Sequence, residues 1–384
     1  MEAAMATLPW DIIVEILSRV AVKSLMRFKC VSKSFNDLIS RDSLFKKKHL
    51  DQSNSTRVMF HCNKGSPMVS VSFSDERVDI SDMTQVKIPH QLDRIHVYTW
   101  DNGLFCFGAN YKGLFIWNPS TQESECILQC KARVSNCIIA CGLIYDPDND
   151  EYKVFVRFER LRSRSGFLFF SSRIGVWRQM FVDIPFDNLR RRQSSFNLLN
   201  GASHWIADNP PIAILSITIA DEKCERLPFP SNFVWKEMRR LLLNLTVLSG
   251  KLCLSCCTTY YDYEAETLSD MLRVRSLDLW VMEEYGAVES WSKKISIPVL
   301  PPHYPDSWIP WYVFVDGTKM LLSTKDMSRR RVFIYDVLEE SLEQTTPDDA
   351  KRAYVWKETL ASPHPNREVI GYGGLDPALD LDFD

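Results

Sequence analysis

The sequence predicts an α+β, multi-domain protein with a small all-α module followed by a large all-β domain. The first observation is that apolar residues recur at helical spacing over about the first fifty residues. The second is that from about residue 56 they alternate along short runs rich in Val, Ile, Phe, Tyr and Trp. The third is that similar strand-and-turn units recur through the second part, which indicates stacked sheets.

The N-terminal module reads as a helical hairpin or a group of three helices. Pro9 stands near the first helical turn, where helices tolerate proline. One apolar stripe follows, and a second begins near Ser24, the expected N-cap of its helix. The stripes contain Ile12, Ile13, Ile16, Leu17 and Val20, then Leu25, Phe28, Val31 and Phe35. A module this small cannot bury both faces of its helices alone, so it needs a partner surface.

The remainder reads as many short strands. The clearest patterns are 57–60, 69–73, 103–107, 113–117, 152–156, 277–281, 320–323 and 332–335. Residues 234–244 are the best helical candidate in this part. Residues 146–150, rich in Asp and lacking the Gly and Glu of a calcium loop, predict a hairpin turn.

Two types of unit alternate along this domain. Segments 116–123, 217–223 and 334–340 each contain a strand and then a small polar turn. Segments 167–177 and 277–291 each contain a strand, a loop and a Trp. Units of this size cannot bury a core alone, so their recurrence predicts a β-propeller-like domain, with a blade count that the irregular repeat does not give.

Composition excludes several classes of protein. The formal net charge is −3, so neither nucleic acid nor an anionic membrane is an expected partner. The first residues lack the basic region of a signal peptide, and the long apolar runs are interrupted by polar residues. We therefore expect a location in the cytoplasm, with the nucleus as a second compartment. The 11 Cys are expected to be reduced. Cys253 and Cys256 form one Cys-x-x-Cys, but no second pair follows at zinc-site spacing, so no metal or cofactor is expected.

Catalytic motifs are missing from the sequence. It has no Gly-x-Ser-x-Gly, no phosphate-binding Gly-x-x-x-x-Gly-Lys and no Gly-x-Gly-x-x-Gly. His204 beside Trp205 reads as a packed histidine at the end of a strand. The sequence therefore favours a binding protein over an enzyme.

Residues 8–35 read LPWDIIVEILSRVAVKSLMRFKCVSKSF, which closely resembles the plant F-box motif. The remainder resembles the F-box-associated domain of the large plant family that includes the S-locus F-box proteins. The resemblance rests on segments 116–121, 143–154, 200–205 and 277–291. Ala21 stands where such F-boxes often have Pro, and Phe35 where they often have Trp.

The resemblance implies an F-box domain at 4–50 and a kelch-like, propeller-like domain at 56–366. Residues 367–384 are acidic and Gly-rich, which predicts a disordered tail. The resemblance also implies a non-catalytic subunit that binds a SKP-type adaptor, and through it the cullin and RING subunits of an SCF ubiquitin ligase. The expected adaptor-binding residues, about half of which should only pack the module's own core, are Leu8, Pro9, Ile13, Leu17, Val20, Leu25, Phe28 and Val31.

The β domain would bind the protein to be ubiquitinated. Basic clusters at 160–164, 190–192 and 329–331 fall between strand patterns, and they read either as solvated loops or as a shared positive rim. The proposed contact residues are Arg190, Arg191, Arg192, Trp308, Trp311, Arg329, Arg330 and Arg331. Secreted S-ribonucleases are one target class that the resemblance implies. A propeller that binds a glycan or small ligand, and an F-box protein acting outside a ligase, remain as alternatives.

Overall fold

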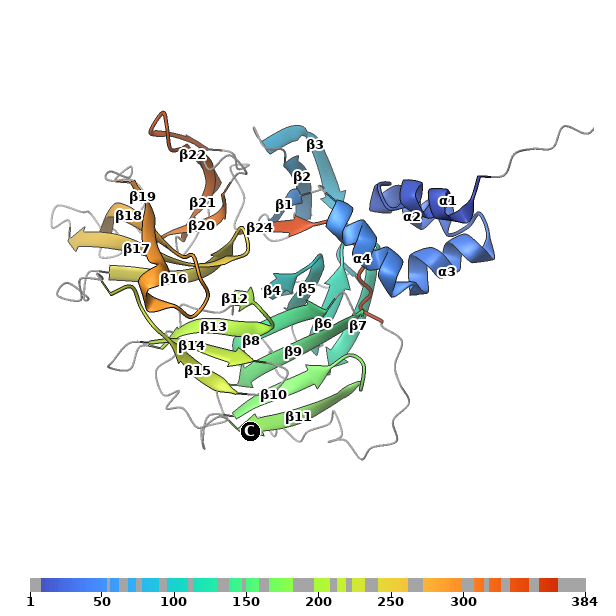
Figure 1. Ribbon diagram of the computed structural model, residues 1–384, viewed down its shortest axis with the longest axis horizontal. Coiled ribbons are helices and arrows are strands. Elements are labelled where there is room, and N and C mark those ends of the chain that lie inside the picture. The colour runs from blue at the N-terminus through green and yellow to red at the C-terminus, as the bar shows by residue number, and fades with distance from the viewer. Residues whose placement is uncertain are drawn as a thin grey trace, which may run out of the picture.

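The computed structural model shows a four-helix module beside a ring of six sheets (Figure 1). It describes residues 8–53, 56–61, 68–73, 78–89, 95–109, 113–129, 138–146, 150–158, 166–181, 197–207, 213–218, 223–231, 241–261, 272–297, 307–313, 318–325, 332–344 and 352–364. Among these residues no helix has both the length and the apolar character needed to cross a bilayer.

The helical module contains α1 (Trp10–Leu17), α2 (Val22–Phe28), α3 (Lys33–Arg41) and α4 (Ser43–Gln52). The expected cap at Ser24 is wrong, because α2 begins two residues earlier, after Ala21. The second apolar stripe is instead divided between α2 and α3. Ser32 caps α3 by accepting a hydrogen bond from the Phe35 amide at 3.2 Å, and Asp42 caps α4 in the same way at 2.9 Å.

Each sheet of the ring has four antiparallel strands and forms one blade of a propeller. Blade 1 contains β24 (Arg352–Lys357), β1 (Thr56–His61), β2 (Met68–Phe73) and β3 (Val78–Val86). Blade 2 contains β4 (Ile95–Asp101), β5 (Leu104–Ala109), β6 (Gly113–Asn118) and β7 (Glu123–Leu128). Blade 3 contains β8 (Ile138–Asp146), β9 (Glu151–Phe158), β10 (Gly166–Ser171) and β11 (Val176–Phe181).

The other three blades follow the same order. Blade 4 contains β12 (Asn197–Leu199), β13 (Ala202–Ala207), β14 (Ala213–Thr218) and β15 (Cys224–Leu227). Blade 5 contains β16 (Leu241–Leu248), β17 (Lys251–Tyr261), β18 (Leu272–Met282) and β19 (Trp291–Ile297), with a short 3-10 helix at Val288–Ser290. Blade 6 contains β20 (Ser307–Val313), β21 (Lys319–Lys325), β22 (Val332–Asp336) and β23 (Ser341–Gln344).

The first strand of each blade lies on the inside of the ring, where β4 contacts β8 and β16 contacts β20. Blade 1 is closed by two distant parts of the chain, because its first strand is β24 and its second is β1. The two pair antiparallel, with Thr56 opposite Lys357. The entry of the chain into the propeller and its exit therefore lie side by side.

Two-residue turns join the first and second strands in three blades. The pairs are Asn102 and Gly103, Asn200 and Gly201, and Ser249 and Gly250, all with positive φ. This conformation matches the right-handed twist of a hairpin and is favoured by Asn and Gly. Residues 147–149 of the hairpin turn predicted at 146–150 lie outside the described residues. The strands on either side, β8 and β9, pair antiparallel with Asp146 opposite Glu151, as a hairpin requires.

All five recurring segments predicted from sequence have the same place in the fold. Segments 116–123, 217–223 and 334–340 connect the third and fourth strands of blades 2, 4 and 6. Segments 167–177 and 277–291 make the same connection in blades 3 and 5. The two unit types thus mark alternate blades of one ring.

The Trp of the second unit type joins neighbouring blades. Trp177 of β11 donates its indole N–H to the Ile127 carbonyl of blade 2 at 2.6 Å. Trp291 of β19 donates in the same way to the Pro228 carbonyl, just after β15 of blade 4, at 2.9 Å. A buried indole satisfies its only donor in this manner while its ring fills the space between two sheets.

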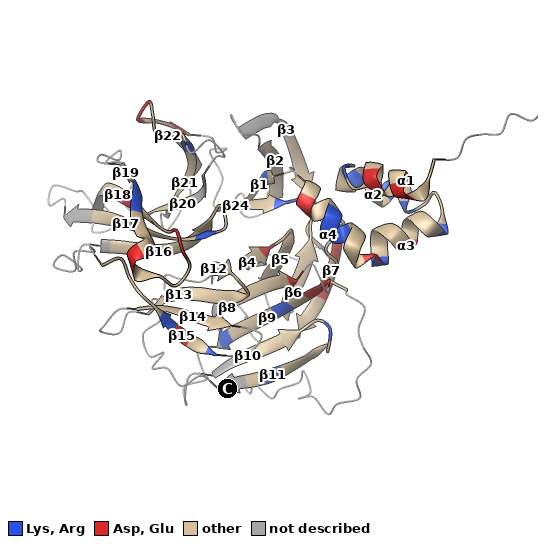
Figure 2. Ribbon diagram, in the orientation of Figure 1, with Lys and Arg blue, Asp and Glu red and all other residues tan. Residues whose placement is uncertain are grey.

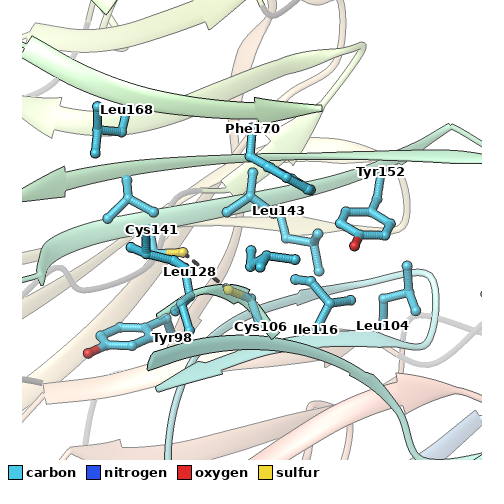
Figure 3. Close-up of a cluster of buried hydrophobic side chains, with 14 of the residues drawn as sticks. Tyr98, Leu104, Cys106, Ile116, Leu128, Cys141, Leu143, Tyr152, Leu168 and Phe170 are labelled. Carbon is cyan, nitrogen blue, oxygen red and sulfur yellow. Dashed lines mark hydrogen bonds between the residues drawn. The ribbon is translucent and has the colours of Figure 1, made fainter. Parts of the chain in front are cut away.

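Buried apolar clusters fill the spaces between adjacent blades. Figure 3 shows one, between blades 2 and 3, where the thiols of Cys106 and Cys141 lie 3.5 Å apart. Burial raises the pKa of the Cys106 thiol well above its usual value, which favours its neutral form. The described residues contain no group of three or more His, Cys, Asp or Glu side chains that could hold a metal.

The helical interpretation of 234–244 is wrong in its described part, because residues 241–244 belong to β16. The Leu-rich run there is a buried strand, which periodicity alone does not separate from a buried helix. Residues 232–240 and the expected tail at 367–384 lie outside the described residues.

We predict that Trp177→Phe will lower the free energy of unfolding in urea by about 1–3 kcal/mol more than Trp117→Phe does, because it leaves the buried Ile127 carbonyl without its donor. Trp117 is the matched control, since it is fully buried but its indole N–H has no acceptor among the described residues. Equal losses in the two variants would contradict a stabilising role for this hydrogen bond.

Candidate functional site

Many large apolar side chains of the helical module are exposed to solvent. Leu8, Ile12 and Ile16 follow each other at four-residue spacing and are 57%, 46% and 51% exposed. Phe28 at the end of α2 and Val31 after it are also exposed. We call these five residues the apolar face. Such a set on a small module is typical of a protein-binding surface.

Behind the apolar face lies the module's own core. Ile13 and Val20 pack against it and are partly buried. Its fully buried members are Leu17, Val22, Leu25, Leu38, Ile39, Phe45 and Leu360. The last of these comes from the end of the propeller domain rather than from a helix.

The eight residues expected at the adaptor surface divide between these two environments. Leu8, Pro9, Phe28 and Val31 are exposed. Leu17 and Leu25 are buried, and Ile13 and Val20 line the core. Leu17 and Leu25 therefore hold the helices in place and are not available for direct contact, whereas Ile13 and Val20 are only partly buried.

Sequence reasoning missed other exposed residues, Trp10, Ile12, Ile16 and Leu44. The available signal was the spacing of Leu8, Ile12 and Ile16. Ile12 and Ile16, one helical turn apart, share one side of α1, and Leu8 precedes the helix.

The two departures from the usual F-box pattern fit the local structure. Phe35 packs against Trp10, with ring centroids 5.9 Å apart. Ala21 precedes α2 with φ of −54°, an angle that proline also adopts. Neither departure disturbs the helices.

Polar contacts fix α1 against α4. Glu15 accepts hydrogen bonds from Arg19 and forms an ion pair with Lys48, and these cations lower the pKa of its carboxyl to about 2. His49 donates from Nε2 to the Val20 carbonyl at 2.9 Å, and burial lowers the pKa of its imidazole. The helices that carry the apolar face are thus held by both core packing and charge.

The module contacts one face of the propeller. Lys46 of α4 forms a buried ion pair with Asp150, in the connection between β8 and β9. Asp150 also accepts a hydrogen bond from the Tyr145 hydroxyl at 2.6 Å. Lys29 lies 3.8 Å from Glu123, at the start of β7. All these propeller residues lie at first-to-second or third-to-fourth strand connections, which share one face because the strands alternate in direction.

Among the residues proposed for substrate contact, one is buried and the side chains of the others lie outside the described residues. Trp308 is an incorrect prediction, because its side chain is completely buried in β20 and packs on Phe333 at 5.1 Å between ring centroids. Trp311 lies in β20 at a register shift between Pro310 and Tyr312, but its side chain is outside the described residues. Residues 190–192 and 329–331 also lie outside them.

A helical module with an apolar face, attached to a six-bladed propeller, defines a two-domain binding protein. The comparisons with known families are specific. The F-box domain model matches residues 5–47, and the model of the F-box associated beta propeller domain matches residues 57–360. The chain therefore belongs to the family of F-box proteins with an F-box-associated β-propeller domain.

Curated relatives agree with this family. An F-box/kelch-repeat protein of Arabidopsis thaliana is 28% identical over 336 residues, covering 82% of this chain and 85% of the relative. The F-box protein CPR1 of the same plant is 27% identical over 328 residues, covering 76% and 73%. Among solved structures, a chain of a nidogen/laminin complex covers 79% of this chain and 99% of its own at 10% identity, with a TM-score of 0.44.

We predict that Lys46→Met will lower the free energy of unfolding in urea by about 3 kcal/mol, because it leaves the Asp150 carboxylate buried without its cation. The double variant Lys46→Met/Asp150→Asn should recover most of this loss, since no unpaired charge then remains. A double variant no more stable than Lys46→Met would contradict this account.

We also predict a pH effect at Asp101, whose carboxyl accepts a hydrogen bond from the Tyr145 amide at 2.8 Å. Burial raises the pKa of the Asp101 carboxyl from 3.8 to about 6. A shift of this size can change the free energy of unfolding by at most about 3 kcal/mol. The folded state therefore binds the proton more tightly, and its contribution to stability, complete below pH 4, is lost as the pH rises through 6.

In Asp101→Asn this contribution is missing, so the free energy of unfolding should fall less between pH 4 and pH 7 than in the wild type. Urea denaturation at several pH values measures the difference. If the free energy of unfolding changed with pH in the same way in the two proteins, Asp101 would not be the source of the effect.

Proposed function

We propose that the chain is the non-catalytic substrate-recognition subunit of an SCF-type ubiquitin ligase. The observation that carries this proposal is the apolar face on the F-box helices. Exposed Leu, Ile, Phe and Val side chains gain most from burial against another protein, and a SKP-type adaptor is the partner that the F-box implies.

Charge supports a partner with an acidic surface. Residues 8–53 contain nine Lys and Arg but only five Asp and Glu, although the whole chain has a formal net charge of −3. Figure 2 shows basic residues on α2, α3 and α4. Positive charges on a binding module speed its association with an acidic partner, and this effect weakens in high salt.

The substrate would be bound on the propeller face away from the helices. The helices contact the face that carries the first-to-second and third-to-fourth strand connections. Strands β9, β11 and β21 end at the opposite face, shortly before the arginine clusters at 160–164, 190–192 and 329–331 in the sequence. Those clusters lie outside the described residues, and a positive rim there remains part of the proposal.

In this scheme the chain catalyses no step itself and only brings a substrate close to the enzyme that carries ubiquitin. The adaptor connects it to cullin and RING subunits, and the propeller raises the local concentration of a substrate near the ubiquitin-carrying enzyme. S-ribonucleases are a substrate class to test first, on the basis of the sequence resemblance. The cytoplasm, with the nucleus as a second compartment, is the location in which such a complex would act.

We predict that Ile12→Asp/Ile16→Asp will abolish capture of the full chain by a purified plant SKP-type adaptor. Both side chains are about half exposed, so charging them should remove apolar contact without unfolding the module. A pull-down measures capture, and circular dichroism with a thermal melt checks the fold.

Leu338→Asp is the matched control, because Leu338 is 77% exposed in blade 6, far along the chain from the helices. Binding by the wild type and the control, with loss in the double variant, supports the adaptor role. Absence of binding by the folded wild type would contradict the adaptor role. The alternative of a propeller that binds a glycan or small molecule would then be tested.

A further inference from the structure

The residues that follow β24 belong structurally to the F-box module. We call residues 358–364 the closing segment. Leu360 is only 4% exposed and packs in the same cluster as Leu17, Leu25 and Phe45. Among the described residues, every other fully buried member of this cluster lies in one of the four helices. The F-box core is therefore completed by a residue more than three hundred positions later in the chain.

The backbone of the closing segment is held by blade 2. The amide of Asn118, which is fully buried, donates to the Thr359 carbonyl at 3.0 Å and to the Ala361 carbonyl at 2.7 Å. These carbonyls flank Leu360 on both sides. The oxygen of the same Asn118 side chain accepts a hydrogen bond from the Ser120 amide at 2.8 Å, which fixes its orientation. One asparagine thus presents Leu360 to the helices.

Further contacts bind the segment to both blades 2 and 3. The Thr359 hydroxyl donates to the Asn102 carbonyl at 2.9 Å, and the Tyr152 hydroxyl donates to the Pro363 carbonyl at 3.0 Å. Gly103 has φ of 78°, and a β-carbon there would lie 2.4 Å from the Thr359 hydroxyl oxygen. Space for the segment therefore depends on a glycine at this turn.

The segment has this path because of how blade 1 closes. Thr56, which follows α4 closely in the chain, pairs with Lys357, the last residue of β24. The chain leaves β24 at the same point where it enters β1, directly beside the module. Blade closure therefore brings Leu360 to the helices.

We propose that the closing segment couples the adaptor-binding state of the F-box to closure of the propeller. The helices form a complete core only when β24 is paired with β1 and Leu360 is inserted. By linkage, an adaptor that binds the completed module must also stabilise the β24–β1 pair. This adaptor part of the proposal rests on the proposed function, whereas the dependence of the helices on Leu360 does not.

Hydrogen–deuterium exchange of the full chain, read by mass spectrometry, tests the first half. In Leu360→Ala we expect amides of α1–α4 to exchange at least tenfold faster than in the wild type, with β16–β19 of blade 5 unchanged. Leu338→Ala is the control, because that leucine is exposed. Unchanged exchange in the helices of folded Leu360→Ala would overturn the proposal.

The milder Leu360→Val carries the same test if Leu360→Ala does not fold. Gly103→Ala offers an independent route, since it crowds the segment without altering the helices. It should also speed exchange in α1–α4, and normal exchange there would count against the proposal.

The second half is tested by adding a SKP-type adaptor. Saturating adaptor should slow exchange in β24 and β1 of the wild type at least threefold and leave blade 5 unchanged. Leu360→Ala should bind the adaptor at least tenfold more weakly by titration and lose this protection. Unaltered affinity in Leu360→Ala would overturn the coupling. A wild type that binds no adaptor would overturn the proposed function and the coupling, while faster helix exchange in Leu360→Ala would still support the dependence on Leu360.

Discussion

The pairing of β24 with β1 is the contact on which the arrangement of this protein depends. It closes the ring by joining the two ends of the propeller domain, and it fixes where the chain enters and leaves. Because the entry leads from α4 and the exit leads to Leu360, both connections hold the F-box module at one face of the propeller. The buried pair of Lys46 and Asp150 adds a polar contact at that face. Several contacts therefore set the geometry between the two domains.

The same topology separates the two proposed binding activities. Antiparallel strands send alternate connections to opposite faces, so contacts to the helices occupy one face and leave the other for a substrate. In a ligase of the proposed type the reaction depends on how a substrate is presented to a distant enzyme. A module held both by its connection to β1 and by the packing of Leu360 would transmit that orientation more faithfully than one attached through a single linker.

Much of the fold could be predicted from sequence because its signals are local. Helical spacing, alternating strands and recurring hairpins such as 116–123 all report on neighbours in the chain. The F-box and its associated propeller were recognisable from dense motifs. The sequence did not reveal the role of Asn118. This residue looks like a turn residue, but its side chain holds the closing segment some 240 positions away. The prediction of Trp308 as a contact residue was wrong for a related reason, since its side chain is completely buried against another strand of the same blade, and the sequence pattern does not show which aromatic residues are buried. Contacts between residues far apart in the chain leave no periodic pattern in the sequence around either residue.

The position of Leu360 has a consequence for synthesis of the chain on the ribosome. The four helices emerge first, yet the residue that completes their core is added more than three hundred positions later. At translation rates of about 5–20 residues per second, roughly 15–60 s separate the two events. During that interval a nascent chain would display F-box helices without a finished interior. In the proposed ligase, incomplete chains would then bind the adaptor more weakly than finished ones, because only a finished ring supplies the missing leucine.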